Sequence, residues 1–400
     1  MENYEFFRAP QTIIYGQKSF EKVGQEASSR GKRALIVSDK IMDRLGYVHQ
    51  CQEYLQDRGV ESSIYLGVDS EPTDQYVAES LEIFKKENCD LVISVGGGSC
   101  IDTAKAIAVL AVNSGYIGDY MGGKKIASQP PIPHIAIPTT AGTGSEATDA
   151  TVITNSSNQV KMMIKQPAFM PLIAIVDPLL TLSSPKHVTA ATGIDALSHA
   201  VEAYLSKKAH PMTDTIALSA MKLIVENIQI AYSDGNNIKA RGAMSLGSLQ
   251  AGMAFSNSSV CLVHGMSRPI GALFHVPHGY SNAMLLPAVL EFSKDSCIDR
   301  LADLGRIFAK GRKVFSNAEA ADLAVESVKK LCQTLHIPNL KGWGIDEKEF
   351  QLAISKMAKD AMESGSPANN PKVPTIQELE ELYMDCFHYN FFLKKEAHND

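Results

Sequence analysis

Two segments of the chain carry side chains whose types and spacing suit a divalent metal ion. Asp195 and His199 lie four residues apart in TGIDALSH, so on a helix both side chains leave the same face. The later run CLVHGMSRPIGALFHVPHG supplies His264, His275 and His278. A lone histidine in such a run is more often a core residue, but several of the eleven histidines gather in these two segments. The pattern predicts one metal site with these ligands: Asp195, His199, His264 and His278.

The donor atoms do not decide which metal binds. Imidazole nitrogen is a good ligand for Fe(II), Zn(II), Co(II) and Ni(II), and one carboxylate partly neutralises the charge of any of them. Such an ion acts as a Lewis acid toward an oxygen atom that it contacts.

A glycine-rich turn is predicted between a buried strand and a helix. It follows the run LVISV and consists of Gly96, Gly97, Gly98 and Ser99. Such a turn lets the backbone approach a phosphate, and the helix N-terminus beyond it offers free N–H groups to a pyrophosphate. Ile101 stands where the last glycine of G-x-G-x-x-G is required, so the ordinary dinucleotide fingerprint is absent. A purely structural turn is the alternative.

A second loop, PTTAGTGSE, also follows a predicted strand. Its hydroxyls at Thr139, Thr140 and Thr143 are interleaved with two glycines, which suits hydrogen bonds to a sugar-phosphate or an amide. Ligands of parallel sheets gather at the carboxyl ends of the strands. The two loops together therefore predict one nucleotide-binding site.

The first predicted strand ends next to an acidic residue. In ALIVSDK, Asp39 is placed to accept hydrogen bonds from an adenosine ribose. A carboxylate there would repel a 2′-phosphate, so the sequence favours NAD over NADP. The alternative is that Asp39 caps the next helix.

The elements that must hold these loops alternate in the first half of the chain. The predicted strands are 34–38, 91–95 and 135–137, with a possible edge strand at 12–15, and the runs 74–88 and 99–113 have helical spacing. Continuous hydrophobicity within the strands favours parallel strands that are covered on both faces. We therefore expect an α/β domain with a mostly parallel, Rossmann-like sheet.

After Pro185 the pattern changes to long runs rich in alanine, leucine and methionine. Helices are predicted at 188–205, 211–231, 238–255 and 318–335. This half should be an all-α domain. We expect a division into residues 1–182, which bind the nucleotide, and residues 183–400, which bind the metal, with a cleft between them.

Composition excludes several classes of protein. The chain has 400 residues, of which 45% are apolar and 20% charged, so it can build full-sized cores. A net charge of −6 gives no basic excess for nucleic acid or an anionic membrane. Apolar runs are too short to span a bilayer and no secretory signal is evident. The seven scattered cysteines suit reduced thiols, so we expect a cytoplasmic protein.

Taken in order, the motifs resemble those of the iron-containing (group III) alcohol dehydrogenases. The resemblance runs through nearly the whole chain and rests on GGGSCIDTAK, IPTTAGTGSE, AIVDP, TGIDALSHAVEAY, the VHGM and PHG segments and the late Asn370-Pro371-Lys372. It implies an architecture like that of dehydroquinate synthase, with a catalytic metal in the cleft between two domains. It also implies at least a homodimer.

Residue by residue, the resemblance assigns roles to positions of this chain. The family's metal ligands fall on the four residues that the spacing had suggested, with Fe(II) the expected ion and Zn(II) the second choice. Its cofactor loops fall on these positions: Gly97, Gly98, Ser99, Thr139, Thr140 and Thr143, with Asp102 close by. Asp39 matches the position linked to rejecting NADP, and Lys161 is included in the expected cofactor-binding set.

One position departs from the family pattern. Many members read H-x-x-x-H-P, with the second histidine suspected of proton transfer, whereas this chain has Arg268 there. Arginine cannot shuttle a proton at neutral pH. We therefore expect His275, or the cofactor ribose with ordered water, to relay the proton. Arg268 is expected either to bind an anionic group of the substrate or to pair with a neighbouring carboxylate.

The expected activity is NAD-linked interconversion of a small primary alcohol or diol and its aldehyde. One alternative is a reductase of a small aldehyde that bears a carboxylate or sulfonate, recognised by Arg268. Two others are a lyase or cyclase similar to dehydroquinate synthase, and a non-catalytic protein that keeps the fold.

Overall fold

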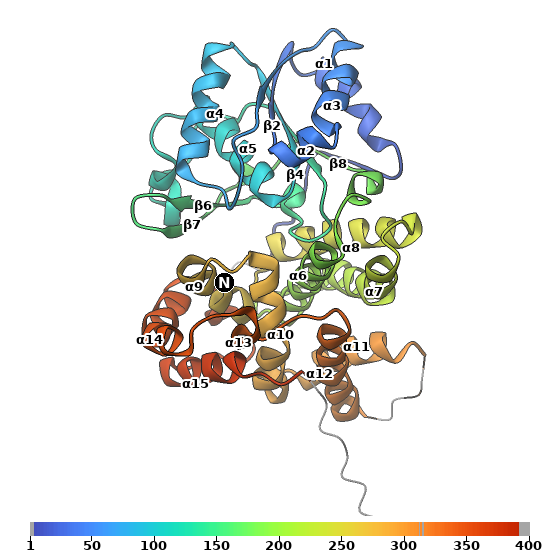
Figure 1. Cartoon of the computed structure of the whole chain (residues 1–400), viewed down its shortest axis with the longest axis vertical. Helices are drawn as coiled ribbons and strands as arrows, with labels where there is room; N and C mark the ends of the chain where they lie inside the picture. Colours follow the sequence, from blue (N-terminus) through green and yellow to red (C-terminus); the bar gives the residue numbers. More distant parts are fainter. Residues whose placement is uncertain (1–3, 312, 314–315, 392–400) are drawn as a thin grey trace, which may run out of the picture.

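The computed structural model describes residues 4–311, 313 and 316–391. They form an α/β lobe and a helical lobe, which are stacked along the long axis of the molecule (Figure 1). The last strand of the α/β lobe ends at Val176, and the first long helix of the other lobe begins at Lys186. The predicted fold class is confirmed.

A parallel sheet of six strands forms the centre of the α/β lobe. Its strand order is β1-β8-β5-β4-β2-β3, and all pairs are parallel. The bounds are β1 Thr12–Tyr15, β2 Arg33–Val37, β3 Glu61–Tyr65, β4 Leu91–Gly96, β5 His134–Pro138 and β8 Ile173–Val176. The predicted strands correspond to β1, β2, β4 and β5.

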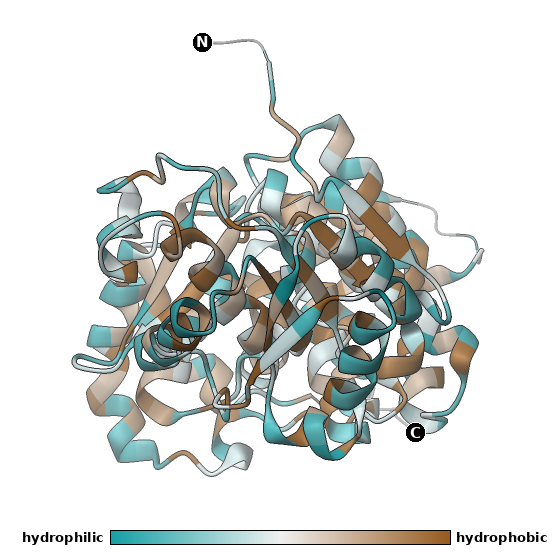
Figure 2. Ribbon diagram, turned by 90° about the horizontal axis from the view of Figure 1, so that it is seen from above, coloured by the Kyte–Doolittle hydropathy of each residue, from teal (hydrophilic) through white to brown (hydrophobic). Residues whose placement is uncertain are grey.

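Helices cover both faces of the sheet. Within β2, Ala34 and Ile36 contact the core on one face, while Leu35 and Val37 contact the core on the other. This explains why the strand sequences are continuously hydrophobic, and Figure 2 shows brown segments among the strands in the middle of the view. The helices are α1 Val23–Ser28, α2 Lys40–Arg44, α3 Tyr47–Gln56, α4 Asp74–Lys86 and α5 Gly98–Leu110.

An antiparallel hairpin is added to this lobe, which the sequence analysis did not predict. It pairs β6, Ala150–Asn155, with β7, Val160–Lys165. Ile153 and Ile164 bury one face of the hairpin against α5 and its neighbours. The hairpin brings Lys161 to the cleft between the lobes.

The second lobe is helical throughout its described part. The four predicted helices correspond to α6 Lys186–Leu205, α7 Pro211–Ser233, α8 Ile238–Asn257 and α12 Asn317–Thr334. The others are α9 Leu262–Phe274, α10 His278–Ser293, α11 Ile298–Ala309, α13 Leu340–Trp343, α14 Glu347–Glu363 and α15 Ile376–Phe387. One large hydrophobic core joins most of them.

Two glycines allow the lobes to pack closely. Gly144, in the second glycine loop, has a φ of +60°, and a Cβ atom there would lie 2.6 Å from the Cα of Gly252 in α8. A Cβ on Gly252 would lie 2.4 Å from the backbone oxygen of Gly144. Part of this glycine-rich sequence therefore serves the joint between the lobes rather than a ligand.

Candidate metal centre and nucleotide cleft

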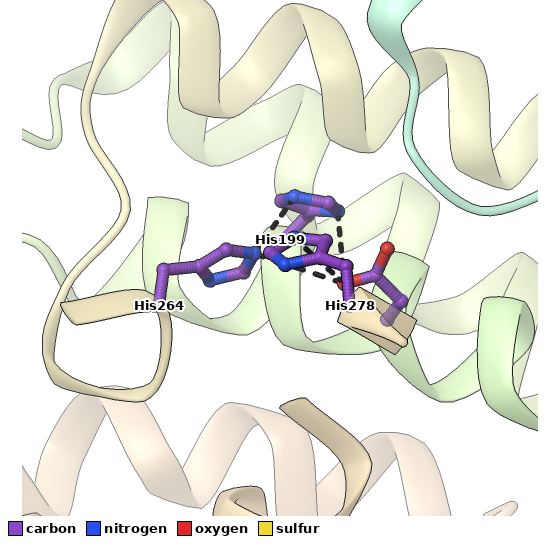
Figure 3. Close-up of side chains that lie close together, drawn as sticks. His199, His264 and His278 are labelled. Atoms are coloured by element: carbon purple, nitrogen blue, oxygen red, sulfur yellow. Dashed lines mark hydrogen bonds and ion pairs between the residues drawn. The ribbon is translucent and has the colours of Figure 1, made fainter. Parts of the chain in front are cut away.

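Three helices bring the four predicted metal-binding side chains together (Figure 3). Asp195 and His199 come from α6, His264 from α9 and His278 from the start of α10. One donor atom from each residue lies within 4.8 Å of the others. His264 Nε2 lies 2.9 Å from His199 Nε2 and 3.7 Å from Asp195 Oδ1. His278 Nε2 lies 3.8 Å from the same oxygen.

Burial keeps the three imidazoles neutral. It lowers the pKa of His199 to about 4 and the pKa of His278 to about 3. It also lowers the pKa of His264 well below its ordinary value. Burial raises the pKa of Asp195, and the neighbouring His278 opposes that rise. Neutral imidazole is the form that binds a metal, since the ring nitrogen then has a free lone pair.

The cluster has the chemical character of a site for a divalent cation. The Nδ1 atom of His199 and the Oδ1 atom of Asn282 are buried without a hydrogen-bond partner among the described residues. Buried polar atoms normally have partners. Three imidazoles and one carboxylate that converge in a largely buried cluster fit a borderline cation such as Fe(II) or Zn(II). The His199 ring also stacks on Phe255, with centroids 4.4 Å apart.

A buried carboxylate that the sequence analysis missed orients one of these imidazoles. Glu202 accepts a hydrogen bond from the backbone N–H of Val263 at 2.6 Å, and its other oxygen lies 2.5 Å from His264 Nδ1. With the Nδ1 proton donated to Glu202, the Nε2 atom of His264 presents its lone pair to the cluster. The signal was available, because Glu202 follows His199 by three residues on the same helix.

Asn282 is a second residue that the sequence analysis missed. Its amide nitrogen donates to Asp195 Oδ1 at 2.6 Å and lies 3.0 Å from His264 Nε2 and 3.1 Å from His278 Nε2. Asn282 follows His278 by four residues in α10, so helical spacing again held the signal. The amide therefore orients the carboxylate of the cluster.

Two adjoining cavities form the cleft beside this cluster. The larger has a volume of about 750 Å³ and is lined by residues that include Asp39, Gly97 and His275. The smaller, of about 250 Å³, is lined by residues that include the three histidines of the cluster and Thr143. Ser99 and Lys161 line both cavities. The space at the glycine loop therefore adjoins the space at the histidines.

Most, but not all, of the predicted cofactor-binding residues line these cavities. The lining includes Asp39, Gly97, Gly98, Ser99, Asp102, Thr143 and Lys161. Gly96, Thr139 and Thr140 are described residues outside the lining of both cavities. The Oγ1 atom of Thr139 is buried without a partner among the described residues. At Gly97 a Cβ atom would meet nothing closer than Thr140 Oγ1 at 3.8 Å, so the backbone there stays open.

Asp39 has the capping contacts that the sequence analysis gave as an alternative. Its Oδ1 atom accepts hydrogen bonds from the backbone N–H groups of Ile41 and Met42 at the start of α2. Because Asp39 also lines the larger cavity, the capped helix N-terminus holds its carboxylate at the edge of that cavity. Capping and a contact with a nucleotide are therefore compatible.

A buried ion pair ties the two cofactor loops together. Asp102 in α5 accepts hydrogen bonds from Ser145 Oγ at 2.6 Å and from the backbone of Val152 at 2.8 Å. Lys105 Nζ lies 3.6 Å from Asp102 and donates to Ser145 Oγ at 2.7 Å and Thr148 Oγ1 at 2.8 Å. Burial lowers the pKa of Lys105, and Asp102 opposes that shift. Asp102 therefore fixes loop geometry as well as lining the smaller cavity.

The two residues predicted to be catalytic lie in different cavities. Arg268 lies one helical turn after His264 in α9 and lines the smaller cavity. His275 ends α9 in a left-handed conformation, with a φ of +53°, and lines the larger cavity. Of the two, Arg268 is the one beside the metal cluster.

Comparison with known proteins is consistent with this geometry along most of the chain. The family model of the iron-containing alcohol dehydrogenase matches residues 10–178, and the model of the C-terminal part of the Fe-containing alcohol dehydrogenase family matches residues 189–387. The chain is 38% identical over 379 residues to the NAD-dependent methanol dehydrogenase of Bacillus methanolicus, which covers 94% of this chain and 98% of that protein.

Two further similar proteins are named for 1,3-propanediol. The chain is 37% identical over 385 residues to the 1,3-propanediol dehydrogenase of Citrobacter freundii, covering 95% of this chain and 98% of that protein. A crystal structure of a 1,3-propanediol oxidoreductase superposes with a TM-score of 0.92 at 35% identity, covering 96% of this chain and 100% of that one. This chain belongs to the iron-containing alcohol dehydrogenase family, and it is an oxidoreductase.

These relatives do not favour a lyase, a cyclase or a non-catalytic protein. They are named as dehydrogenases or oxidoreductases rather than as lyases or binding proteins.

Among the residues that the structure describes, no helix is both long enough and apolar enough to cross a lipid bilayer.

Proposed function

We propose that this enzyme interconverts a small primary alcohol or diol and its aldehyde, with NAD(H) as hydride carrier and Fe(II) at the histidine cluster. The observation that carries the proposal is that the two cavities adjoin, because Ser99 and Lys161 line both the nucleotide cavity and the cavity of the cluster. A volume of about 250 Å³ beside the histidines suits a substrate of few atoms. Relatives named for methanol and 1,3-propanediol support the same substrate size.

The chain's own contribution is to fix the reacting groups and to exclude water. When bound, the metal supplies Lewis-acid polarisation of the substrate oxygen and the nicotinamide exchanges the hydride. Glu202 holds the ring of His264 in one tautomer, and Asn282 holds the carboxylate of Asp195. Enclosure between the lobes strengthens electrostatic interactions at the reacting oxygen and keeps competing water away.

We propose that His275 passes the proton of the alcohol to solvent. Its ring is exposed and lines the nucleotide cavity, so it has access both to bulk water and to a bound cofactor. Arg268 is beside the cluster but holds its proton at neutral pH. His275→Ala should remove an ionisation from the pH dependence of kcat. An unaltered pH–rate profile would leave the relay to the cofactor ribose with ordered water.

The remaining expectations concern the division into domains, the oligomeric state and the cellular compartment. We propose that residues 1–182 act as the nucleotide-binding unit and residues 183–400 as the metal-binding unit, in a homodimer or larger oligomer in the cytoplasm. The seven cysteines are free thiols, which supports a reducing compartment. β1 is an edge strand of the sheet, and an unpaired edge can accept a second chain. Light scattering coupled to size-exclusion chromatography measures the oligomeric state.

Metal removal and reconstitution test the proposed function. Treatment with a chelator should abolish NADH formation from 1-propanol and 1,3-propanediol, and anaerobic Fe(II) should restore it better than Zn(II). Assays in both directions with NADH and NADPH establish the coenzyme. Full activity in the protein after its metal has been removed would contradict the proposal.

A further inference from the structure

Arg268 is a cation inside the substrate cavity that lacks an acidic partner. It lies four residues after His264 on α9, so both side chains project from the same face of that helix. Both residues line the cavity of about 250 Å³, together with His199 and His278. A guanidinium group therefore lies in the space where the substrate is proposed to bind.

No protein group in the described part of the chain satisfies this guanidinium. Across residues 4–311, 313 and 316–391, no carboxylate oxygen lies within 4.0 Å of it and it makes no hydrogen bond. The nearby Glu202 uses one oxygen for Val263 N–H and the other for His264 Nδ1. The ion pair that the sequence left open as an alternative is thus absent from the described structure.

The other cations of the cavity have partners. Lys161 lies 3.1 Å from Glu71 Oε2, and Lys165 lies 3.4 Å from Asp149 Oδ1. None of the nitrogen atoms of Arg268 belongs to the buried atoms without partners, so its donors remain open to the cavity. Burial of the side chain lowers the pKa of Arg268, and the charge of Glu202 opposes that shift.

A guanidinium group in such a place recognises an oxyanion. Its planar set of N–H donors binds a carboxylate, sulfonate or phosphonate through two parallel charge-assisted hydrogen bonds. A neutral alkanol offers it no comparable acceptor, and leaving charged donors unpaired in an enclosed site is costly.

We propose that Arg268 binds an anionic group at the far end of the substrate, so that the enzyme prefers a short aldehyde or alcohol that bears a carboxylate or sulfonate. This inference rests on the proposed function, because it places the reacting oxygen at the histidine cluster. The small cavity limits the chain between the two ends to a few atoms. The reaction itself is unchanged, since the anionic group takes no part in hydride transfer.

A matched pair of aldehydes tests the preference. Sulfoacetaldehyde and 3,3-dimethylbutanal have nearly the same shape, but the first carries three sulfonate oxygens where the second carries three methyl groups. The iron-loaded enzyme should reduce the sulfonate with a kcat/KM at least about tenfold higher. In Arg268→Met this value should fall about 30- to 100-fold for the sulfonate, and less than about threefold for the neutral aldehyde. Arg268→Lys keeps the charge, so its kcat/KM for the sulfonate should lie between that of the unaltered enzyme and that of Arg268→Met.

Lys165→Met serves as the matched control, because it removes a cation of the same cavity that already has an acidic partner. It should lower both rates by a similar factor. An equal loss for both aldehydes in Arg268→Met, or no preference in the unaltered enzyme, would overturn the inference.

Two further measurements separate this inference from the proposed function. Propanal is assayed on the same enzyme preparation: turnover of propanal without a preference for the sulfonate defeats the inference alone, whereas absence of any turnover defeats the proposed function. Calorimetric titration of the metal-free protein with ethanesulfonate needs no activity. Binding that Arg268→Met weakens at least tenfold supports the inference, and binding of equal strength in both proteins contradicts it.

Discussion

Glu202→Gln is expected to weaken metal binding without removing a metal ligand. The carboxylate holds His264 through a 2.5 Å contact with Nδ1 and is itself held by Val263 N–H at 2.6 Å. Glutamine keeps the shape but has one acceptor oxygen, so it cannot accept from both Val263 N–H and His264 Nδ1–H. The bond that remains is neutral and about half as strong. Loss of such a partner typically lowers metal affinity about 10- to 100-fold, or about 1.4–2.7 kcal/mol.

The assay is an anaerobic titration of the metal-free protein with Fe(II) or Co(II) against a competing chelator. Glu326→Gln is a matched control, because that glutamate is exposed on α12, a helix that carries none of the four predicted metal ligands. Circular dichroism establishes that both variants are folded. If folded Glu202→Gln bound the metal as tightly as the control, the proposed positioning of His264 by Glu202 would be refuted.

Three other perturbations have defined outcomes. Burial raises the pKa of Glu146 to about 7, with Lys105 opposing, so the folded state holds a proton that the unfolded state releases between about pH 4.5 and 7. The free energy of unfolding should fall by about 3 kcal/mol in total across that range, and Glu146→Gln should remove most of that fall in urea unfolding. An unchanged pH dependence contradicts this. Gly252→Ala should lower the free energy of unfolding by about 2–3 kcal/mol, because its Cβ atom would meet the oxygen of Gly144. Gly97→Ala should fold normally but bind NADH more weakly. Equal stability of the two variants would be inconsistent with this packing. Asp39→Asn keeps the helix cap but loses the charge. The ratio of kcat/KM for NADPH to that for NADH should therefore rise about tenfold. A constant ratio would exclude repulsion between Asp39 and the 2′-phosphate of NADPH.

Regular periodicity made much of the fold predictable. The strands at 34–38, 91–95 and 135–137 are buried on both faces, so their hydrophobic runs were unbroken and correspond to β2, β4 and β5. β3 was not predicted, because it lies at an edge of the sheet and its sequence, ESSIY, is largely polar. The β6–β7 hairpin escaped because its strands are only partly buried and are joined by a polar turn.

The site was predictable where helical spacing determines geometry. Asp195 and His199 share one face of α6, and the structure brings His264 and His278 to them from two other helices. The hydrogen bonds of Glu202 and Asn282 depend on how three helices pack, which spacing within one helix does not specify. For the same reason, the sequence could not show that no carboxylate oxygen of the described residues lies within 4.0 Å of the Arg268 guanidinium.

The central claim is that one divalent ion is held by three imidazoles and one carboxylate at the end of the nucleotide cleft. Anaerobic titration of the metal-free protein with Co(II), followed by its visible absorption, measures this directly. The account predicts one strongly bound Co(II) per chain, with an absorption spectrum of low coordination number that is lost in both His264→Ala and His278→Ala. Co(II) binding of unchanged strength and spectrum in those two variants would contradict it.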